Sequence, residues 1–170
     1  MKHGTGVLRA VVLGLLVGGC TPDVPDRSAI VARVADLVSN PNPEGIDTLE
    51  FVTIGETRQA ISIRGRDRRN PILLFIHGGP ASPTMGMSWA FQRPWEDYFT
   101  VVQWDQRGSG KSVIAEADRA RLASTMTLDQ FVLDAEAIVD HLRQRLGQEK
   151  VIVMGWSWGT AIGARLAMRV

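Results

Sequence analysis

The stretch of sequence that decides the fold reads Val151-Ile152-Val153-Met154-Gly155-Trp156-Ser157-Trp158-Gly159-Thr160. It joins a short apolar run, typical of a buried strand, to residues 160–167, whose composition is typical of a helix. At its centre is a G-x-S-x-G motif, a sharp turn that holds the serine in a strained conformation and exposes its hydroxyl to a substrate carbonyl. Gly155 and Gly159 leave room for that turn. The motif alone also fits a plain glycine-rich turn, but the strand and the helix around it favour Ser157 as a catalytic nucleophile.

A second apolar run, residues 71–76, leads directly into His77-Gly78-Gly79-Pro80 and predicts a fully buried strand. Glycines at this place expose backbone N–H groups, which an oxyanion hole requires. Where a nucleophile elbow is present, one donor is the N–H of the residue after the nucleophile, here Trp158. The other comes from the loop after the third strand, and Gly79 is the candidate. An ordinary turn is the alternative interpretation of residues 77–80. The nucleophile elbow at residues 155–159 favours the oxyanion hole.

The third informative stretch reads Asp105-Gln106-Arg107-Gly108-Ser109-Gly110-Lys111-Ser112 and follows a strand-like run, residues 101–104. Its ending, GSGKS, is similar to the end of a phosphate-binding P-loop. That motif needs glycine at its first position, which here is Asp105. A carboxylate would also place negative charge beside the phosphates, so no nucleotide is expected. We expect instead that Asp105 pairs with Arg107 and stabilises a tight turn at the edge of the active-site face.

Hydrophobic patterning predicts the remaining elements. Residues 49–54 and 59–64 are typical of two strands in an opening hairpin. An amphipathic helix is predicted from about Leu128 to Leu146, and Gly147 is well placed to end it.

Taken in order, the segments HGGP, DQRGSGKS and GWSWGT resemble those of the proline iminopeptidase branch of the α/β-hydrolase superfamily. The resemblance covers residues 46–170. It implies the N-terminal half of an α/β-hydrolase fold: an initial hairpin, then mostly parallel strands with helices, ending just after the nucleophile elbow. It also implies a serine hydrolase that removes an N-terminal residue, preferentially proline, from peptides without a metal or organic cofactor. By position, Ser157 is the nucleophile, and the N–H groups of Gly79 and Trp158 form the oxyanion hole.

Two residues depart from the pattern of that family. Ala81 stands where the family usually has glycine, and Trp156 stands where it has a small residue. These changes bear on the preference for proline more than on the reaction class. Trp156 and Trp158 flank the serine, and we expect them to wall an apolar pocket suited to a flat ring.

The N-terminus carries a separate signal. Basic residues precede an apolar stretch, residues 10–17, and small residues then lead to the only cysteine, Cys20. The stretch is too short to span a bilayer but fits a secretory signal peptide. The cysteine resembles a bacterial lipoprotein processing site, which implies removal of residues 1–19 and lipidation of Cys20. A plain signal peptide with an incidental cysteine is the second interpretation.

Residues 20–45 are punctuated by proline and predict a lipid-anchored tether with a short helix that lies on the catalytic domain. The expected location is therefore the bacterial cell envelope, on the periplasmic or outer-surface side, with secretion as the second choice. The net charge of +1, from 19 basic and 18 acidic residues, provides no field that would attract nucleic acid. The expected partners are a short peptide or small acyl substrate, and the membrane through the lipid on Cys20.

The acid and the base of a catalytic triad follow the serine in this architecture, and residues 158–170 contain no Asp, Glu or His. We therefore expect the catalytic domain, residues 46–170, to be truncated and the chain as given to be inactive. Three functions stay open. The first is a serine aminopeptidase, the second an esterase or other acyl hydrolase with the same elbow, and the third a non-catalytic envelope lipoprotein.

Overall fold

The computed structural model describes residues 26–40, 42–113 and 119–169. Its centre is one five-stranded sheet with the strand order β1-β2-β4-β3-β5. The strands are β1 (Ile46–Ile54), β2 (Thr57–Gly65), β3 (Ile72–Ile76), β4 (Thr100–Asp105) and β5 (Val151–Gly155). All five predicted strands are thus confirmed, with bounds that differ from the prediction by a few residues at most.

The pairing of the strands agrees with the predicted fold class. β1 and β2 form the antiparallel opening hairpin, whose turn places Gly55 at φ 50° and Glu56 at φ 62°. β2 also runs antiparallel to β4, whereas β3 runs parallel to both β4 and β5. The register pairs Ile76 with Trp104 on one side and with Gly155 on the other. The loops that follow these strands therefore leave the sheet at the same edge, where open α/β sheets bind their ligands.

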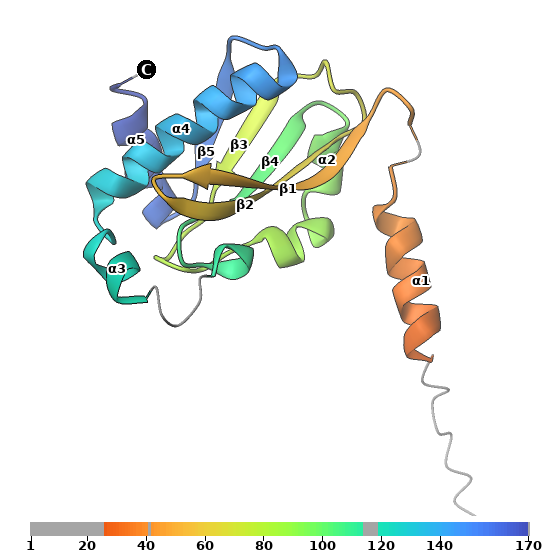
Figure 1. Ribbon diagram of the computed structural model, residues 1–170. Coiled ribbons are helices and arrows are strands. Elements are labelled where there is room, and N and C mark those ends of the chain that lie inside the picture. The colour runs from red at the N-terminus through yellow and green to blue at the C-terminus, as the bar shows by residue number, and fades with distance from the viewer. Residues whose placement is uncertain (1–25, 41, 114–118, 170) are drawn as a thin grey trace, which may run out of the picture.

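Two helices cover one face of this sheet, α4 (Leu128–Leu146) and α5 (Trp158–Leu166) (Figure 1). The α4 helix begins at a Thr127 cap, whose side chain accepts from the N–H of Gln130 at 3.2 Å, and it ends at Gly147 with φ 66°. Both ends agree with the predicted bounds, because a hydroxyl suits the start of a helix and a left-handed glycine its end. The apolar side of α4 packs on buried strand residues, among them Ile63, Leu74 and Val102.

The opposite face carries a smaller set of elements. Because side chains alternate along a strand, Phe75 points away from the face that Leu74 and Ile76 present to α4 and α5. There it contacts two aromatic rings, Phe91 at 6.3 Å and Trp95 at 6.2 Å between centroids. These rings belong to the segment that contains the 3-10 helix η1 (Met85–Ala90) and α2 (Arg93–Glu96).

One edge strand of the sheet is β5, and the other is β1. Within the described part of the chain, β5 pairs only with β3, and Ile152 and Met154 on it are 46% and 42% exposed. Two short elements lie between β4 and α4, the 3-10 helix η2 (Gly110–Ser112) and α3 (Arg119–Ser124).

The predicted helix before the sheet is present as α1 (Arg27–Val38), but the prediction that it lies on the catalytic domain is wrong. Figure 1 shows α1 standing away from the sheet, and its apolar residues Ile30, Val31 and Leu37 are exposed. Among the described residues, the hydrogen bonds that attach it to the rest of the protein are at its C-terminal end, where the Arg93 guanidinium donates to the carbonyl groups of Leu37 and Ser39. The apolar positions of this helix therefore have no partner surface among the described residues.

The predicted signal peptide, residues 1–19, and the predicted lipidation site, Cys20, lie outside the described residues. Among the helices that the structure does describe, none combines the length and the apolar character needed to cross a membrane.

Candidate active site

Ser157 occupies the corner between β5 and α5 with backbone angles φ 53° and ψ −117°. A positive φ is rare for a residue with a side chain, and such strain is concentrated at functional sites. Ser157 is exposed to solvent, so its hydroxyl stands clear of the turn. The strained turn that the sequence predicts around this serine is therefore present.

Glycine is required on both sides of the serine because the turn is compact. A Cβ at Gly155 would lie 2.7 Å from the Cα of Thr160 and closer still to the backbone of Gly159. A Cβ at Gly159 would lie 2.8 Å from the carbonyl oxygen of His77 and would overlap that of Ile76. Gly159 therefore packs directly against the backbone at the end of β3 and at the start of the loop that follows it.

The loop His77-Gly78-Gly79-Pro80 lies directly against the elbow. A Cβ at Gly78 would be 3.2 Å from both the Cβ of Ser157 and the carbonyl oxygen of Trp156. The N–H of Trp156 in turn donates to the carbonyl oxygen of Ile76 at 3.0 Å. The segment predicted to contain the nucleophile and the segment predicted to contain an oxyanion donor are thus adjacent in space.

The two expected oxyanion donors are available to a ligand. Gly79 has φ 125°, a conformation open to glycine but strained for other residues. Trp158 is the first residue of α5, where a helix leaves its N–H groups without intrahelical partners. Within the described residues, neither the N–H of Gly79 nor that of Trp158 donates a hydrogen bond to another group. Within the described part of the chain, both N–H groups are therefore free to donate to a ligand.

His77 is fully buried and has a structural role in the same loop. Its Nε2 accepts from the backbone N–H of Gln106 at 3.2 Å, which places the ring proton on Nδ1. That Nδ1–H lies 2.7 Å from the carbonyl oxygen of Gly78 and donates to it. Burial lowers the pKa of the imidazole below its ordinary value of 6.5. The neutral ring has both nitrogens engaged, so it is not a base for Ser157.

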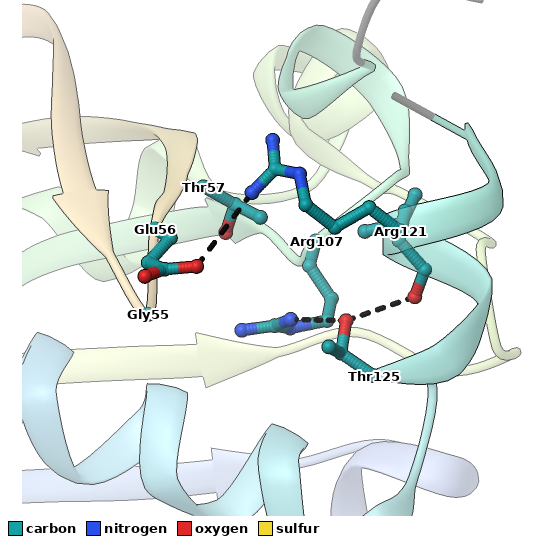
Figure 2. Close-up of a pocket in the computed structure, with 7 residues that line it drawn as sticks. Gly55, Glu56, Thr57, Arg107, Arg121 and Thr125 are labelled. Carbon is teal, nitrogen blue, oxygen red and sulfur yellow. Dashed lines mark hydrogen bonds and ion pairs between the residues drawn. The ribbon is translucent and has the colours of Figure 1, made fainter. Parts of the chain in front are cut away.

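The loop after β4 is a tight turn as predicted, but the predicted pair between Asp105 and Arg107 is wrong. The Arg107 guanidinium instead forms two bonds of 2.6 Å with the Asp134 carboxylate on α4. Both side chains are almost fully buried, and Arg107 also donates to the Thr125 hydroxyl at 2.7 Å (Figure 2). Sequence reasoning missed Asp134 because it lies on the apolar side of a helix whose other buried residues are hydrophobic.

The Asp105 carboxylate has a different role. It accepts the backbone N–H of Lys111 at 2.7 Å, and a Cβ at Gly110 would overlap it. In a phosphate-binding loop, backbone N–H groups of this kind face the phosphate. Here the N–H of Lys111 already donates to the Asp105 carboxylate, which is a physical reason to expect no nucleotide at this turn.

The second described histidine, His141, lies far from the elbow along the sheet. It faces Glu50 of β1 across 3.9 Å, and β1 is separated from β5 by the other three strands. Neither described histidine is therefore placed to accept a proton from Ser157. Among the described residues there is also no cluster of His, Cys, Asp and Glu side chains that is suited to a metal ion.

The two tryptophans that flank the serine point into different surroundings, so they do not wall one pocket as predicted. Trp156 is 57% exposed and lines an apolar hollow of about 390 Å³. Trp158 turns instead toward α4, where its ring meets Phe131 edge-on at 5.9 Å. The hollow is lined by Phe75, Thr84, Met87, Phe91, Trp95, Met154, Gly155 and Trp156.

A sheet of this order, with an exposed and strained serine after β5, defines an α/β hydrolase. The chain belongs to this family: the model described as alpha/beta hydrolase fold matches residues 71–170.

The chain is 37% identical over 122 residues to a probable aminopeptidase of Bacillus subtilis, YbaC, in a match that covers 72% of this chain and 37% of that protein. It is 33% identical to a proline iminopeptidase of Arabidopsis thaliana, covering 58% of this chain and 23% of that one.

Solved structures are also similar to it. A proline iminopeptidase-related protein of Thermus thermophilus matches with a TM-score of 0.59 and 26% identity, covering 73% of this chain and 41% of that one. An epoxide hydrolase of Mycobacterium thermoresistibile matches with a TM-score of 0.53 and 26% identity, covering 72% and 35%. The chain thus spans well under half the length of the relatives it matches.

Proposed function

We propose that the protein is a serine hydrolase in which Ser157 is the nucleophile. The observation that carries the proposal is the backbone of Ser157, φ 53° and ψ −117°, at an exposed strand-to-helix corner beside Gly78. A protein retains such strain only where the surrounding structure enforces it, and functional sites are where it gathers.

The proposed reaction proceeds through an acyl-enzyme. The Ser157 oxygen attacks the substrate carbonyl carbon, and the carbonyl oxygen becomes an oxyanion that accepts from the N–H groups of Gly79 and Trp158. The bond from carbon to the leaving amine or alcohol then breaks, and the proton from the serine passes through a base to that leaving group. Water then attacks the ester carbon, the bond from that carbon to the Ser157 oxygen breaks, and the proton from the water passes through the base to Ser157 as the acid is released.

An acid and a base are needed for this reaction, since a serine hydroxyl is a weak nucleophile without them. His77 and His141 are placed elsewhere, as described above, and no Asp, Glu or His occurs in residues 158–170. We therefore propose that polypeptide outside the described residues supplies both groups, and that the 170-residue chain alone has no meaningful activity.

The proposed substrate is a peptide whose N-terminal residue, proline foremost, is released. Support comes from the relatives, of which one is named a probable aminopeptidase and another a proline iminopeptidase. The apolar hollow beside Trp156 also suits the CH₂ groups of a proline ring better than a charged side chain. An ester or other acyl substrate is the second candidate, because the proposed nucleophile and donors act on the carbonyl group and not on the leaving group.

Hydrolysis of proline β-naphthylamide by the full-length protein tests the proposal. Ser157→Ala is expected to lower turnover by several orders of magnitude, about 10⁶-fold where a triad serine is removed. Ser124→Ala, which alters an exposed serine on α3, is the matched control and should leave turnover unchanged.

A full-length protein that hydrolyses p-nitrophenyl esters but not the naphthylamide would favour the acyl hydrolase. Turnover that survives Ser157→Ala would contradict the proposal. No turnover and no covalent labelling of the full-length protein would favour the non-catalytic lipoprotein.

We also propose a location in the bacterial cell envelope, with the chain anchored through lipid on Cys20. The supporting observation is the order of charges, apolar residues and small residues before that cysteine.

A further inference from the structure

Gln106, the first residue after β4, holds the loop that follows β3 at two points. Its backbone N–H donates to the imidazole Nε2 of His77 at 3.2 Å. Its side-chain amide donates to the backbone carbonyl oxygen of the same histidine at 2.9 Å. Gln106 is 1% exposed and His77 0%, so water does not compete for either bond. Together the two bonds fix both the ring and the peptide plane that leads into Gly78.

His77 transmits this constraint to the reacting atoms. Its Nδ1–H donates to the carbonyl oxygen of Gly78, so the ring also braces the next peptide. Gly78 lies against the Cβ of Ser157, and Gly79 follows it directly. A shift of His77 therefore moves the N–H of Gly79 relative to the Ser157 oxygen.

We propose that Gln106 is a positioning residue for the oxyanion hole: through His77 it sets the place of the Gly79 N–H beside Ser157. This inference rests on the proposed function, because it concerns the same serine. Gln106 itself touches neither the proposed nucleophile nor its donors.

The neighbours of Gln106 on both sides are held firmly, which makes it a rigid support. The Asp105 carboxylate accepts the N–H of Lys111 at 2.7 Å. The Arg107 guanidinium is bound to Asp134 on α4 by two bonds of 2.6 Å. The backbone at position 106 is thus fixed to the rest of the domain, and the Gln106 side-chain amide contacts His77 from this fixed position.

The oxygen of the Gln106 side-chain amide argues against a purely stabilising role for this residue. Its Oε1 is buried and has no hydrogen-bond partner among the described residues. A buried polar group that is left unsatisfied costs more than one net hydrogen bond contributes. An apolar replacement removes the unsatisfied Oε1 but leaves the carbonyl oxygen of His77 without its donor, so the two effects offset each other. An apolar side chain of the same shape is therefore expected to fold about as well, and the amide is explained by the bond it makes to His77.

The first test replaces Gln106 with methionine, which keeps the length of the side chain and removes the amide. We measure the rate constant for labelling of Ser157 by a fluorophosphonate in the full-length protein. A small displacement of a reacting group costs up to about 10²-fold, and loss of one oxyanion donor about 10²–10³-fold, so Gln106→Met should label about 10–100-fold more slowly. With a naphthylamide substrate the loss should fall on kcat and not on KM, since the oxyanion forms only in the transition state.

Gln92→Met is the matched control. Gln92 is another fully buried glutamine with two side-chain hydrogen bonds, to Glu96 and Gln103, and it lies outside the loop after β3. Its replacement is expected to lower the melting temperature without slowing the labelling of folded protein. Equal slowing in both variants would show that general loosening, not the bond to His77, is responsible.

The second test uses Gln106→Glu, which keeps the shape and makes the donor titratable. The protonated carboxyl can donate to the carbonyl oxygen of His77, whereas the carboxylate cannot. The titratable groups beside it are His77, which is neutral above pH 6.5 because burial lowers its pKa, and Asp105, whose charge together with burial raises the pKa of the new carboxyl. The ratio of variant to wild-type labelling rates should therefore be near one at low pH and fall as pH rises. A ratio that is constant with pH would contradict the inference.

A readout independent of catalysis separates this inference from the proposed function. The backbone amide resonance of Gly79, followed by ¹⁵N NMR, should shift in both Gln106 variants and stay in place in Gln92→Met. Wild-type protein that fails to label at all would overturn the proposed function, and the resonance would still report whether Gln106 sets the loop. Wild-type protein that labels, with Gln106 variants that label equally fast, would overturn the inference alone.

Discussion

At the scale of single residues, the glycine at position 159 beside the Ser157 turn determines how closely two segments of the site can approach each other. The corner between β5 and α5 brings the backbone at Gly159 against the carbonyl groups of Ile76 and His77, so that no side chain fits there. The same contact brings the loop after β3 to the serine. The close approach of Gly159 to Ile76 and His77 therefore both requires glycine at position 159 and brings the parts of the site together.

Gly159→Ala is expected to destabilise the protein strongly. The new Cβ would overlap the backbone of β3, and overpacking of this kind typically costs about 1–3 kcal/mol of unfolding free energy, with backbone contacts at the upper end. Gly163→Ala, in the same helix, is the control. There the Cβ would lie 3.3 Å from a Val153 methyl, and alanine gains about 1 kcal/mol of helix propensity. Urea denaturation of both variants measures the difference, and equal stabilities would refute this account of the elbow.

His77 predicts a dependence of stability on pH. Burial lowers the pKa of its imidazole in the folded protein below the ordinary 6.5, so the unfolded chain binds more protons as the solution becomes acidic. The contribution of His77 to stability is therefore complete above pH 6.5 and is lost as pH falls from there toward the folded pKa.

The measurement is urea denaturation at a series of pH values. His77→Asn, whose amide can still donate to the carbonyl oxygen of Gly78, should remove this part of the acid sensitivity. The control His141→Asn should retain it. Identical pH profiles for the wild type and His77→Asn would show that the buried ring is not the source.

At the scale of elements, the hydrophobic pattern of the sequence predicts the strands, the long helix α4 and the elbow. Alternation and uninterrupted apolar runs determine which strands have one face or two faces buried, and Gly147 marks the end of α4 as expected. The resemblance of three short segments predicts the family as well as the position of the serine.

Contacts between elements were not predictable in the same way. The sequence places Arg107 two residues from Asp105 and suggests that they pair, but Asp134 on α4 provides the partner, 27 residues away. A buried carboxylate on an apolar helix face carries no periodic signal that would reveal its partner. Likewise, the apolar residues of α1 predict that it packs on the domain, whereas Ile30, Val31 and Leu37 are exposed.

The Arg107–Asp134 pair joins three elements, since Asp134 also accepts from Gln59 on β2 at 2.8 Å. Asp134→Leu leaves the buried guanidinium without its carboxylate, and removal of one partner of a buried pair costs about 3–5 kcal/mol of unfolding free energy. The double variant Arg107→Met with Asp134→Leu should recover a large part of that loss. Thermal or urea unfolding measures both.

The exposed pair between Arg143 and Asp140 provides the control. Exposed ion pairs contribute at most about 1 kcal/mol, so Asp140→Asn should have little effect. Comparable losses in Asp134→Leu and Asp140→Asn would mean that burial of the Arg107 pair has no special energetic role.

At the scale of the whole molecule, the sheet, the elbow and the loop after β3 form the proposed site, and the proposed reaction needs an acid and a base in addition. The donors and the serine lie together at the carboxyl edge of the strands, whereas the two described histidines are engaged elsewhere. Under the proposed function, the described residues bind and attack the carbonyl, and the proton transfer is assigned to groups outside them.

Lipidation of Cys20 is the prediction that concerns the location of the whole molecule. Protein produced in a bacterial host that processes lipoproteins should begin at Cys20 and carry acyl chains, since two or more chains give stable anchoring that one alone does not. Mass spectrometry of the detergent-extracted protein measures this directly. Cys20→Ser is the control and should yield a precursor without lipid. An unmodified Cys20 within an uncleaved N-terminus would refute the assignment.

The central claim is that Ser157 is a nucleophile, and the most direct measurement is the site of covalent attachment. The full-length protein is treated with a fluorophosphonate probe, digested, and analysed by tandem mass spectrometry. The adduct is expected on Ser157 and is expected to be absent in Ser157→Ala and after unfolding in urea. An adduct on another residue, or none on Ser157 in the folded full-length protein, would contradict the account.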